Sequence, residues 1–238
     1  MDWLYIVLVV LPGMLISGGA SMLVKKTFKK YSTVQSRNGF TGAQAAQRLL
    51  DEAGIKDVQV VRSRGFLSDH YNPKSKHLAL SEPVFDSTSI AALGVATHEA
   101  GHAIQHATSY GPLGWRSAIV PVAHYGSSLG QYAMMGGLAL LGVSQVLGQW
   151  VVMIGAVLFA GMLLFQLVTL PVEYNASARA KRLVVESGIV GADERTGIDK
   201  VLGAAALTYV AAAVSTALTL LYFLVKAGII GGRRNQRR

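Results

Sequence analysis

The residues of this chain that could do chemistry together form the pentapeptide His98-Glu99-Ala100-Gly101-His102. Two histidines four positions apart lie on one face of a helix, so both imidazoles can reach a single tetrahedral Zn²⁺. The glutamate between them can accept a proton from water at that ion, as it does in zinc hydrolases with this pattern. The alternative interpretation is two histidines and a glutamate on the surface of an ordinary helix.

A catalytic zinc needs a third protein ligand and an open position for water. His106 lies about 12 Å along the helix axis from His98, so it cannot complete the site and is interpreted as a hydrogen-bonding support. Glu173 is the better candidate, because two apolar crossings separate it from His102 and return the chain to the same membrane face. We expect a helix to begin at Glu173 and to hold its carboxylate rigidly. The alternative role of Glu173 is an ion pair with a nearby cation.

The motif has this geometry only within a helix, and the surrounding sequence predicts one over Ile90–Ala107. This run contains no proline and is rich in Ala, Leu and Val. Ser87-Thr88-Ser89 offer capping oxygens in front of it, and Tyr110-Gly111-Pro112 end it. The two histidines and the glutamate therefore lie well inside a helix.

The polar segment before the motif is expected to be mostly helical, with a short β element. Thr41–Ala53 has helical periodicity, whereas Val58–Val61 and His77–Leu80 alternate as short strands around a turn at Ser68–Pro73. In many zinc proteases a strand edge beside the metal pairs with an extended substrate, and His77–Leu80 is our candidate for that strand. The alternative is a small hairpin that only covers the motif helix.

The composition places these elements at a membrane. Hydrophobic residues make up 51% of the chain and charged residues only 15%, which is too apolar for an ordinary soluble domain. Trp3–Val24 has no charge and is followed by four lysines, which indicates a membrane anchor. Ser117–Val172 is uncharged and long enough for two crossings, with a turn within Gly142–Gln149, and Val201–Val225 is a further uncharged run.

We therefore predict a mainly α membrane protein with about four transmembrane helices and a small α+β zincin-like metallopeptidase region at the membrane surface. The expected segments are a transmembrane anchor (1–24), a peptidase region with the motif helix (25–116), a two-span transmembrane hairpin (117–172), a third-ligand helix region (173–200), and a fourth apolar helix with a basic tail (201–238).

The charge distribution favours a cytoplasmic active site in a multi-pass protein of the cell membrane. Most of the 22 Lys and Arg residues lie in segments 25–116 and 173–200, and the positive-inside tendency places such segments in the cytoplasm. The absence of cysteine is compatible with that compartment. Four crossings would, however, carry the arginine-rich tail to the outside. The net charge of +9 is better explained by anionic lipid headgroups than by nucleic acid, because it lies beside apolar spans.

Several separate blocks of the sequence resemble the YugP-type membrane zinc metallopeptidases, a gluzincin-like family related in pattern to the HtpX-like membrane proteases. The resemblance covers nearly the whole chain, and in chain order the blocks read DHYNP, HLALSEPVF, HEAGHAIQH, LPVEYNASARA and AAALTYVAAA. The resemblance implies zinc ligation by His98 and His102, a catalytic Glu99, and Glu173 as the third ligand by analogy with HtpX and CAAX-protease gluzincins.

Three residues depart from the pattern expected of that family. Asn72 and Asn175 stand where we would expect Asp, and Ser177 stands where HtpX-like enzymes tend to carry Asp. The departures leave open which side chains support the ligand histidines.

The expected reaction is zinc-assisted hydrolysis of peptide bonds in membrane or membrane-proximal proteins. Glu99 accepts the proton of the attacking water and returns it to the leaving amine. Arg179, one to two helical turns beyond Glu173, is our candidate donor to the developing oxyanion, and a simple ion pair is its alternative role.

Two other functions are alternatives to this reaction. A site-2-type intramembrane protease would carry a ligand aspartate in a Leu-Asp-Gly context, which this sequence lacks. A non-enzymatic membrane protein with a structural metal would have no use for Glu99. The expected partners are a peptide or membrane-protein substrate and the lipid bilayer, but not nucleic acid, and the sequence leaves open whether a homo-oligomer or an accessory membrane protein takes part.

Overall fold

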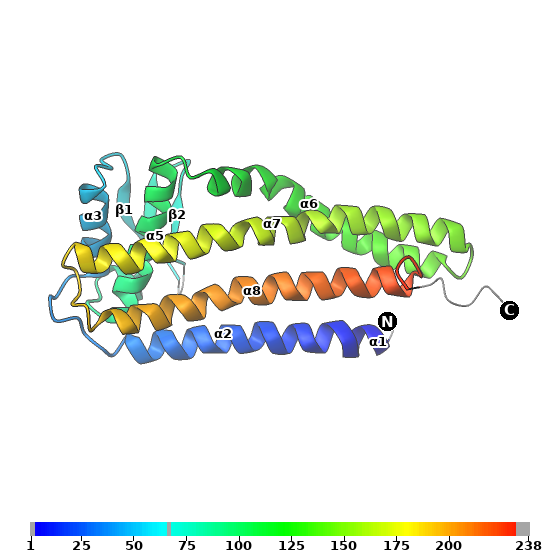
Figure 1. The fold of residues 1–238 in the computed structure, drawn as a ribbon, viewed down its shortest axis with the longest axis horizontal. Coiled ribbons are helices and arrows are strands. Elements are labelled where there is room, and N and C mark those ends of the chain that lie inside the picture. The colour runs from blue at the N-terminus through cyan, green and yellow to red at the C-terminus, as the bar shows by residue number, and fades with distance from the viewer. Residues whose placement is uncertain (1–2, 66–67, 232–238) are drawn as a thin grey trace. The chain divides into compact units, whose positions relative to one another are not determined.

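The computed structural model describes residues 3–65 and 68–231 of the 238-residue chain. The chain is mainly helical and carries one small sheet, as Figure 1 shows. It divides into two compact units, each assembled from separate parts of the sequence. Unit 1 comprises Met1–Gly19, Trp115–Leu170 and Thr208–Arg238, and unit 2 comprises Ala20–Gly114 and Pro171–Leu207.

The motif helix of unit 2 forms as the sequence predicts. Helix α5 runs over Ile90–Ala107, and the Ser89 hydroxyl caps it by accepting a hydrogen bond from the backbone N–H of Ala92 at 3.3 Å. The helix is buried along most of its length, because its alanines and leucines pack into the main hydrophobic core of the unit. A buried helix of small residues lets neighbouring backbones come close to the motif.

Helix α3 (Gly42–Glu52) packs against α5 and also confirms its prediction. The Thr41 hydroxyl accepts from the N–H of Gln44 at 3.2 Å, and the Gln44 side chain accepts from the N–H of Thr41 at 2.9 Å. This reciprocal capping fixes the first turn. Leu49 and Leu50 are then buried in the core of the unit.

The sheet of unit 2 differs from the expected pair of strands. It has three strands in the order β1-β3-β2, namely β1 (Gln59–Ser63), β2 (His70–Asn72) and β3 (His77–Ser81). β1 pairs with β3 in parallel, and β2 pairs with β3 antiparallel. Residues 70–72, expected within a turn, therefore form a strand, and the turn begins only at Pro73.

The prediction that His77–Leu80 is a free strand edge for substrate is wrong. β3 is the central strand, paired with β1 along its length and with β2 over residues 77–79, so it is not a free edge for an added peptide. Most of its side chains are also buried. The edge strand that contacts α5 is β2 instead.

The third-ligand segment lies in the interior of a long helix. Helix α7 runs over Gln145–Glu186 with Pro171 inside it, so the prediction that a helix begins at Glu173 is wrong. Proline lacks an N–H and often marks a helix boundary, but apolar helices tolerate it where neighbouring groups satisfy the freed backbone. The remaining helices of unit 2 are α4 (Glu82–Phe85), the end of α2 (Leu11–Tyr31), and the start of α8 (Arg195–Lys226).

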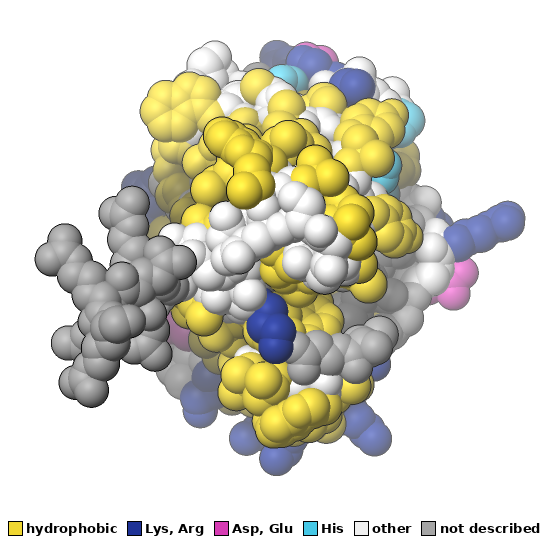
Figure 2. Space-filling model, turned by 90° about the vertical axis from the view of Figure 1, so that its right-hand side faces the viewer, with side chains coloured by type: hydrophobic (Ala, Val, Ile, Leu, Met, Phe, Trp, Pro, Cys, Tyr) yellow, Lys and Arg dark blue, Asp and Glu magenta, His cyan; other side chains and the backbone are white. Residues whose placement is uncertain are grey.

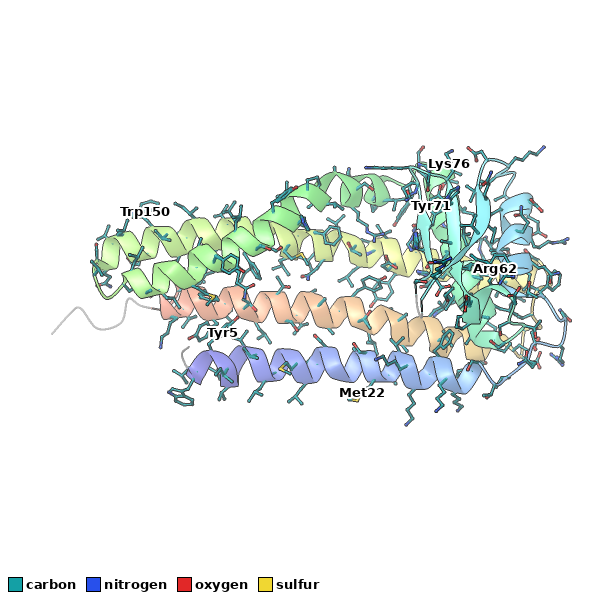
Figure 3. All side chains as sticks on the ribbon, turned by 180° about the vertical axis from the view of Figure 1, so that it is seen from behind. Tyr5, Met22, Arg62, Tyr71, Lys76 and Trp150 are labelled. Carbon is teal, nitrogen blue, oxygen red and sulfur yellow. The ribbon has the colours of Figure 1, made fainter. Side chains whose placement is uncertain are left out.

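Unit 1 is built from apolar helices. It contains α1 (Trp3–Tyr5), the π-helix η1 (Ile6–Val10), most of α6 (Gly111–Leu140), and parts of α2, α7 and α8. Between α6 and α7, glycines let the backbones meet: a Cβ added at Gly130 would lie 2.6 Å from the carbonyl oxygen of Gly155. Hydrophobic side chains predominate on the face drawn in Figure 2, and Trp150 extends outward from α7 in Figure 3.

Three helical stretches in the described part of the chain are long and apolar enough to cross a membrane. They are Trp3–Tyr31, Gln145–Glu186 and Arg195–Lys226. Helix α6, with 30 residues, is not among them. The turn between α6 and α7 falls at residues 141–144, close to its expected place. A fourth crossing thus stays a prediction.

Candidate metal centre

Three side chains of unit 2 converge as a metal-ligand set. The Oε2 atom of Glu173 lies 3.2 Å from Nε2 of His98 and 3.4 Å from Nε2 of His102. Two ligands on one tetrahedral zinc, each about 2.05 Å from the ion, lie about 3.3 Å apart. The donor set of two imidazoles and one carboxylate, and the spacing of these atoms, therefore fit a catalytic zinc.

The second nitrogen of each histidine ring is already engaged. Nδ1 of His102 lies 2.9 Å from Oε1 of Gln105, and Nδ1 of His98 lies 3.1 Å from the hydroxyl of Ser177. The two rings meet edge to face, with centroids 4.7 Å apart. Both Nε2 atoms are thus directed at Glu173 by hydrogen bonds at the far side of each ring. Ser177 takes the place in which an aspartate was expected.

Glycine in the motif permits the meeting of α5 with α7. A Cβ added at Gly101 would lie 2.7 Å from the carbonyl oxygen of Ala176, which is too close for any side chain. Ala176 follows Glu173 by three residues, so the point of closest approach lies beside the third ligand. Since Glu173 belongs to the interior of α7, its backbone is held on both sides by helix, and its side chain is only 3% exposed.

Glu99 has the setting of a proton acceptor. It is 9% exposed, and no hydrogen bond from a described residue engages its carboxylate. Burial lowers the pKa of His102, but the hydrogen bond with Glu173 and the charge of Glu99 outweigh it, so the pKa is raised overall. The negative charge collected around the histidines is what a bound cation would neutralise.

Arg179 is linked to the ligand His102 through other side chains. Its Nε donates to Oδ1 of Asn175 at 2.9 Å, and the same oxygen accepts from Nε2 of Gln105 at 3.0 Å. The structure therefore brings His98, His102 and Glu173 together and joins Arg179 to them through two intervening side chains. Lys181, another cation near Glu173 in the sequence, pairs with Asp199 at 3.6 Å.

His106 supports the sheet. Its Nδ1 lies 2.8 Å from the hydroxyl of Tyr71 on β2, and the two rings are 5.8 Å apart. Figure 3 shows Tyr71 in the region of the strands. His106 thus makes a hydrogen bond as predicted, but its partner is a strand residue, and its support of the metal ligands stays a prediction. Gln105 is the site residue that the sequence did not predict, although its place three residues after His102 puts it on the same helical face.

Comparison with known proteins shows the family of the chain. The family model described as "Putative neutral zinc metallopeptidase" matches residues 5–228. The chain is also similar to the "Putative membrane protease YugP" of Bacillus subtilis (strain 168), with 47% identity over 206 residues, which are 87% of this chain and 89% of that protein. No solved structure matches the chain.

Proposed function

Because the chain belongs to this family of neutral zinc metallopeptidases, we propose that it is a membrane-embedded, zinc-dependent endopeptidase that cleaves membrane or membrane-proximal proteins. The observation that carries the proposal is the convergence of His98, His102 and Glu173 at the spacing of a tetrahedral zinc site. The protease role also follows the name of the relative from Bacillus subtilis. The membrane role follows the three apolar helices.

Zinc, Glu99 and Arg179 have separate roles in the proposed hydrolysis. Zinc, when bound, supplies Lewis-acid activation of water and of the scissile carbonyl. Glu99 accepts the proton of the attacking water and later delivers it to the leaving amine, for which its buried carboxylate has no competing hydrogen-bond donor among the described residues. Arg179 is our candidate donor to the developing oxyanion. Its Nε donates to Asn175, so Arg179 would have to reach the substrate from that position.

The test separates metal binding from chemistry. Purified wild-type protein and the Glu99→Gln variant are compared for zinc content and for hydrolysis of a quenched fluorescent peptide library. We expect about one zinc per chain in both proteins and a loss of hydrolysis of about 10²–10⁴-fold in the variant, because only the proton acceptor is removed. Near-wild-type hydrolysis by Glu99→Gln would refute the proposed chemistry, whereas wild-type protein without zinc would refute the site. A structural metal centre would bind zinc and show no hydrolysis that depends on Glu99.

We propose that the metal centre faces the cytoplasm, since most Lys and Arg residues lie in the two segments that supply its ligands. The chain has no cysteine, so single cysteines can report its topology. Ser75→Cys and Ala192→Cys, both at exposed positions, should be shielded from a membrane-impermeant thiol reagent in intact cells. Gln145→Cys, at the exposed start of α7, should be labelled. Labelling of both Ser75→Cys and Ala192→Cys would reverse the orientation, and labelling of only one would contradict the three-ligand site.

A further inference from the structure

Gln105 is a fully buried amide that makes three hydrogen bonds beside the metal centre. Its Oε1 lies 2.9 Å from Nδ1 of His102. Its Nε2 donates to the carbonyl oxygen of Val172 at 2.8 Å and to Oδ1 of Asn175 at 3.0 Å. A single side chain of α5 is therefore bonded both to a metal-ligand histidine and to the backbone of α7 one residue before Glu173.

The partners of this amide determine which way it faces. The Val172 carbonyl can only accept a hydrogen bond. Oδ1 of Asn175 also accepts from Arg179, and a guanidinium can only donate, so the atom of Asn175 that faces Gln105 must be its oxygen. Two acceptors on one side of Gln105 require its NH₂ group there, because the flipped amide would set oxygen against oxygen. Its Oε1 then faces His102.

The orientation of Gln105 in turn fixes the tautomer of His102. An amide oxygen can only accept, so Nδ1 of His102 must carry the proton in its hydrogen bond with Gln105. In the neutral ring, Nε2 is then the unprotonated nitrogen and directs its lone pair at the point shared with His98 and Glu173. The donor Arg179 and the acceptor Val172 thus determine the orientation of Gln105. That orientation in turn determines which nitrogen of His102 is free to bind metal.

We propose that Gln105 is a positioning residue that holds His102 in the metal-binding tautomer and fastens α5 to α7 next to Glu173. It thereby sets the affinity of the centre for zinc. This inference rests on the proposed zinc site and adds a determinant outside the His-Glu-x-x-His motif. Loss of a partner of this kind costs about 10–100-fold in metal affinity.

The first measurement is zinc affinity in the full-length protein by competition with a chromophoric chelator. Gln105→Leu, which keeps the approximate volume and removes all three hydrogen bonds, should weaken zinc binding by about 10–100-fold. Gln47→Leu, the same replacement at an exposed position of α3, is the matched control and should bind as wild type. Wild-type affinity in Gln105→Leu would overturn the inference. Absence of zinc binding in the wild type itself would instead overturn the proposed function.

The second measurement separates positioning from a purely structural role. Gln105→Glu keeps an oxygen that can accept from His102 but, when ionised, has no donor for α7. Nitrogen NMR of ¹⁵N-histidine-labelled apo protein, at a pH high enough for the His102 ring to be neutral, should therefore show the Nδ1–H form of His102 in the wild type and in Gln105→Glu. In Gln105→Leu, or in Gln105→Ala if the leucine variant fails to fold, a mixture of tautomers is expected. If Gln105→Leu or Gln105→Ala showed the same His102 signals as the wild type, Gln105 would contribute only to packing, and the inference would be refuted.

Discussion

Helix α7 closely approaches α5 in unit 2 and α6 in unit 1. In both contacts a glycine permits the approach. At Gly101 and at Gly130 a glycine faces a backbone carbonyl of α7, so that an added Cβ would lie 2.7 and 2.6 Å from that oxygen. The neighbour of Gly130 is Phe159, which belongs to an apolar cluster with Met134 and Val152. Around Gly101 the neighbours are the metal ligands and the side chains bonded to them.

This difference shows what a site needs beyond close packing. The α6–α7 contact needs only complementary shape, because its surroundings are apolar and small residues let the backbones approach. The α5–α7 contact must also give each polar atom a partner and a direction, since an unpaired buried polar group is costly. Substitutions at the two contacts should therefore affect different properties of the protein.

The largest expected effect is on the ligands themselves. His98→Ala should reduce bound zinc to background and abolish hydrolysis, because two ligands cannot hold the ion in place of three. Glu173→Ala should weaken binding in the same direction. Elemental analysis of the purified proteins measures both changes, and equal zinc in Glu173→Ala and wild type would remove Glu173 from the centre.

Gly101→Ala is expected to lower catalytic activity by about 10²-fold, because a displacement of about 1 Å at an active site has that cost. The new methyl group would meet the carbonyl of Ala176, so α7 must shift and take Glu173 with it. Peptide hydrolysis at saturating zinc measures the effect. Activity equal to that of the wild type would show that α7 yields without moving the ligand.

Ser177→Ala should have a smaller effect of about tenfold on zinc affinity, at the low end of the range for partners of ligand histidines. The hydroxyl is bonded to Nδ1 of His98 at 3.1 Å, and its loss frees that ring to rotate. Chelator competition measures the change. Ser127→Ala, whose hydroxyl bonds only its own helix, is a control for serine removal and should bind zinc as the wild type does.

Gly130→Ala should leave zinc affinity unchanged and destabilise the protein by about 1–3 kcal/mol, the usual cost of overpacking. It is the counterpart of Gly101→Ala, with the same added methyl group against α7 in an apolar contact. Thermal unfolding in detergent measures the stability. A loss of peptide hydrolysis comparable to that expected of Gly101→Ala would contradict the distinction between the two contacts.

What the sequence predicts well here is local. The cap at Ser89, the absence of proline over Ile90–Ala107 and the spacing of His98 and His102 are all contained in one short stretch. Glu173 is also predicted beside the histidines, where the structure places it. The two crossings on which its prediction rests stay a prediction, because only α7 of the two helices is among the candidate spans.

What the sequence does not predict depends on distant partners. The strand order β1-β3-β2 decides that β3 has no free edge, and no residue within β3 signals it. Pro171 gives the local signal of a boundary, yet α7 passes through it. Gln105 carries no pattern of its own, since its role comes from a carbonyl 67 positions later in the chain.

The separation of the ligands in the chain also has a consequence for biosynthesis. His98 and Glu173 are 75 residues apart, so the centre has only two of its ligands when α5 leaves the ribosome. At about 5–20 residues per second, synthesis of the intervening residues takes about 4–15 s. During this interval the nascent chain lacks Glu173 and cannot complete the three-ligand set.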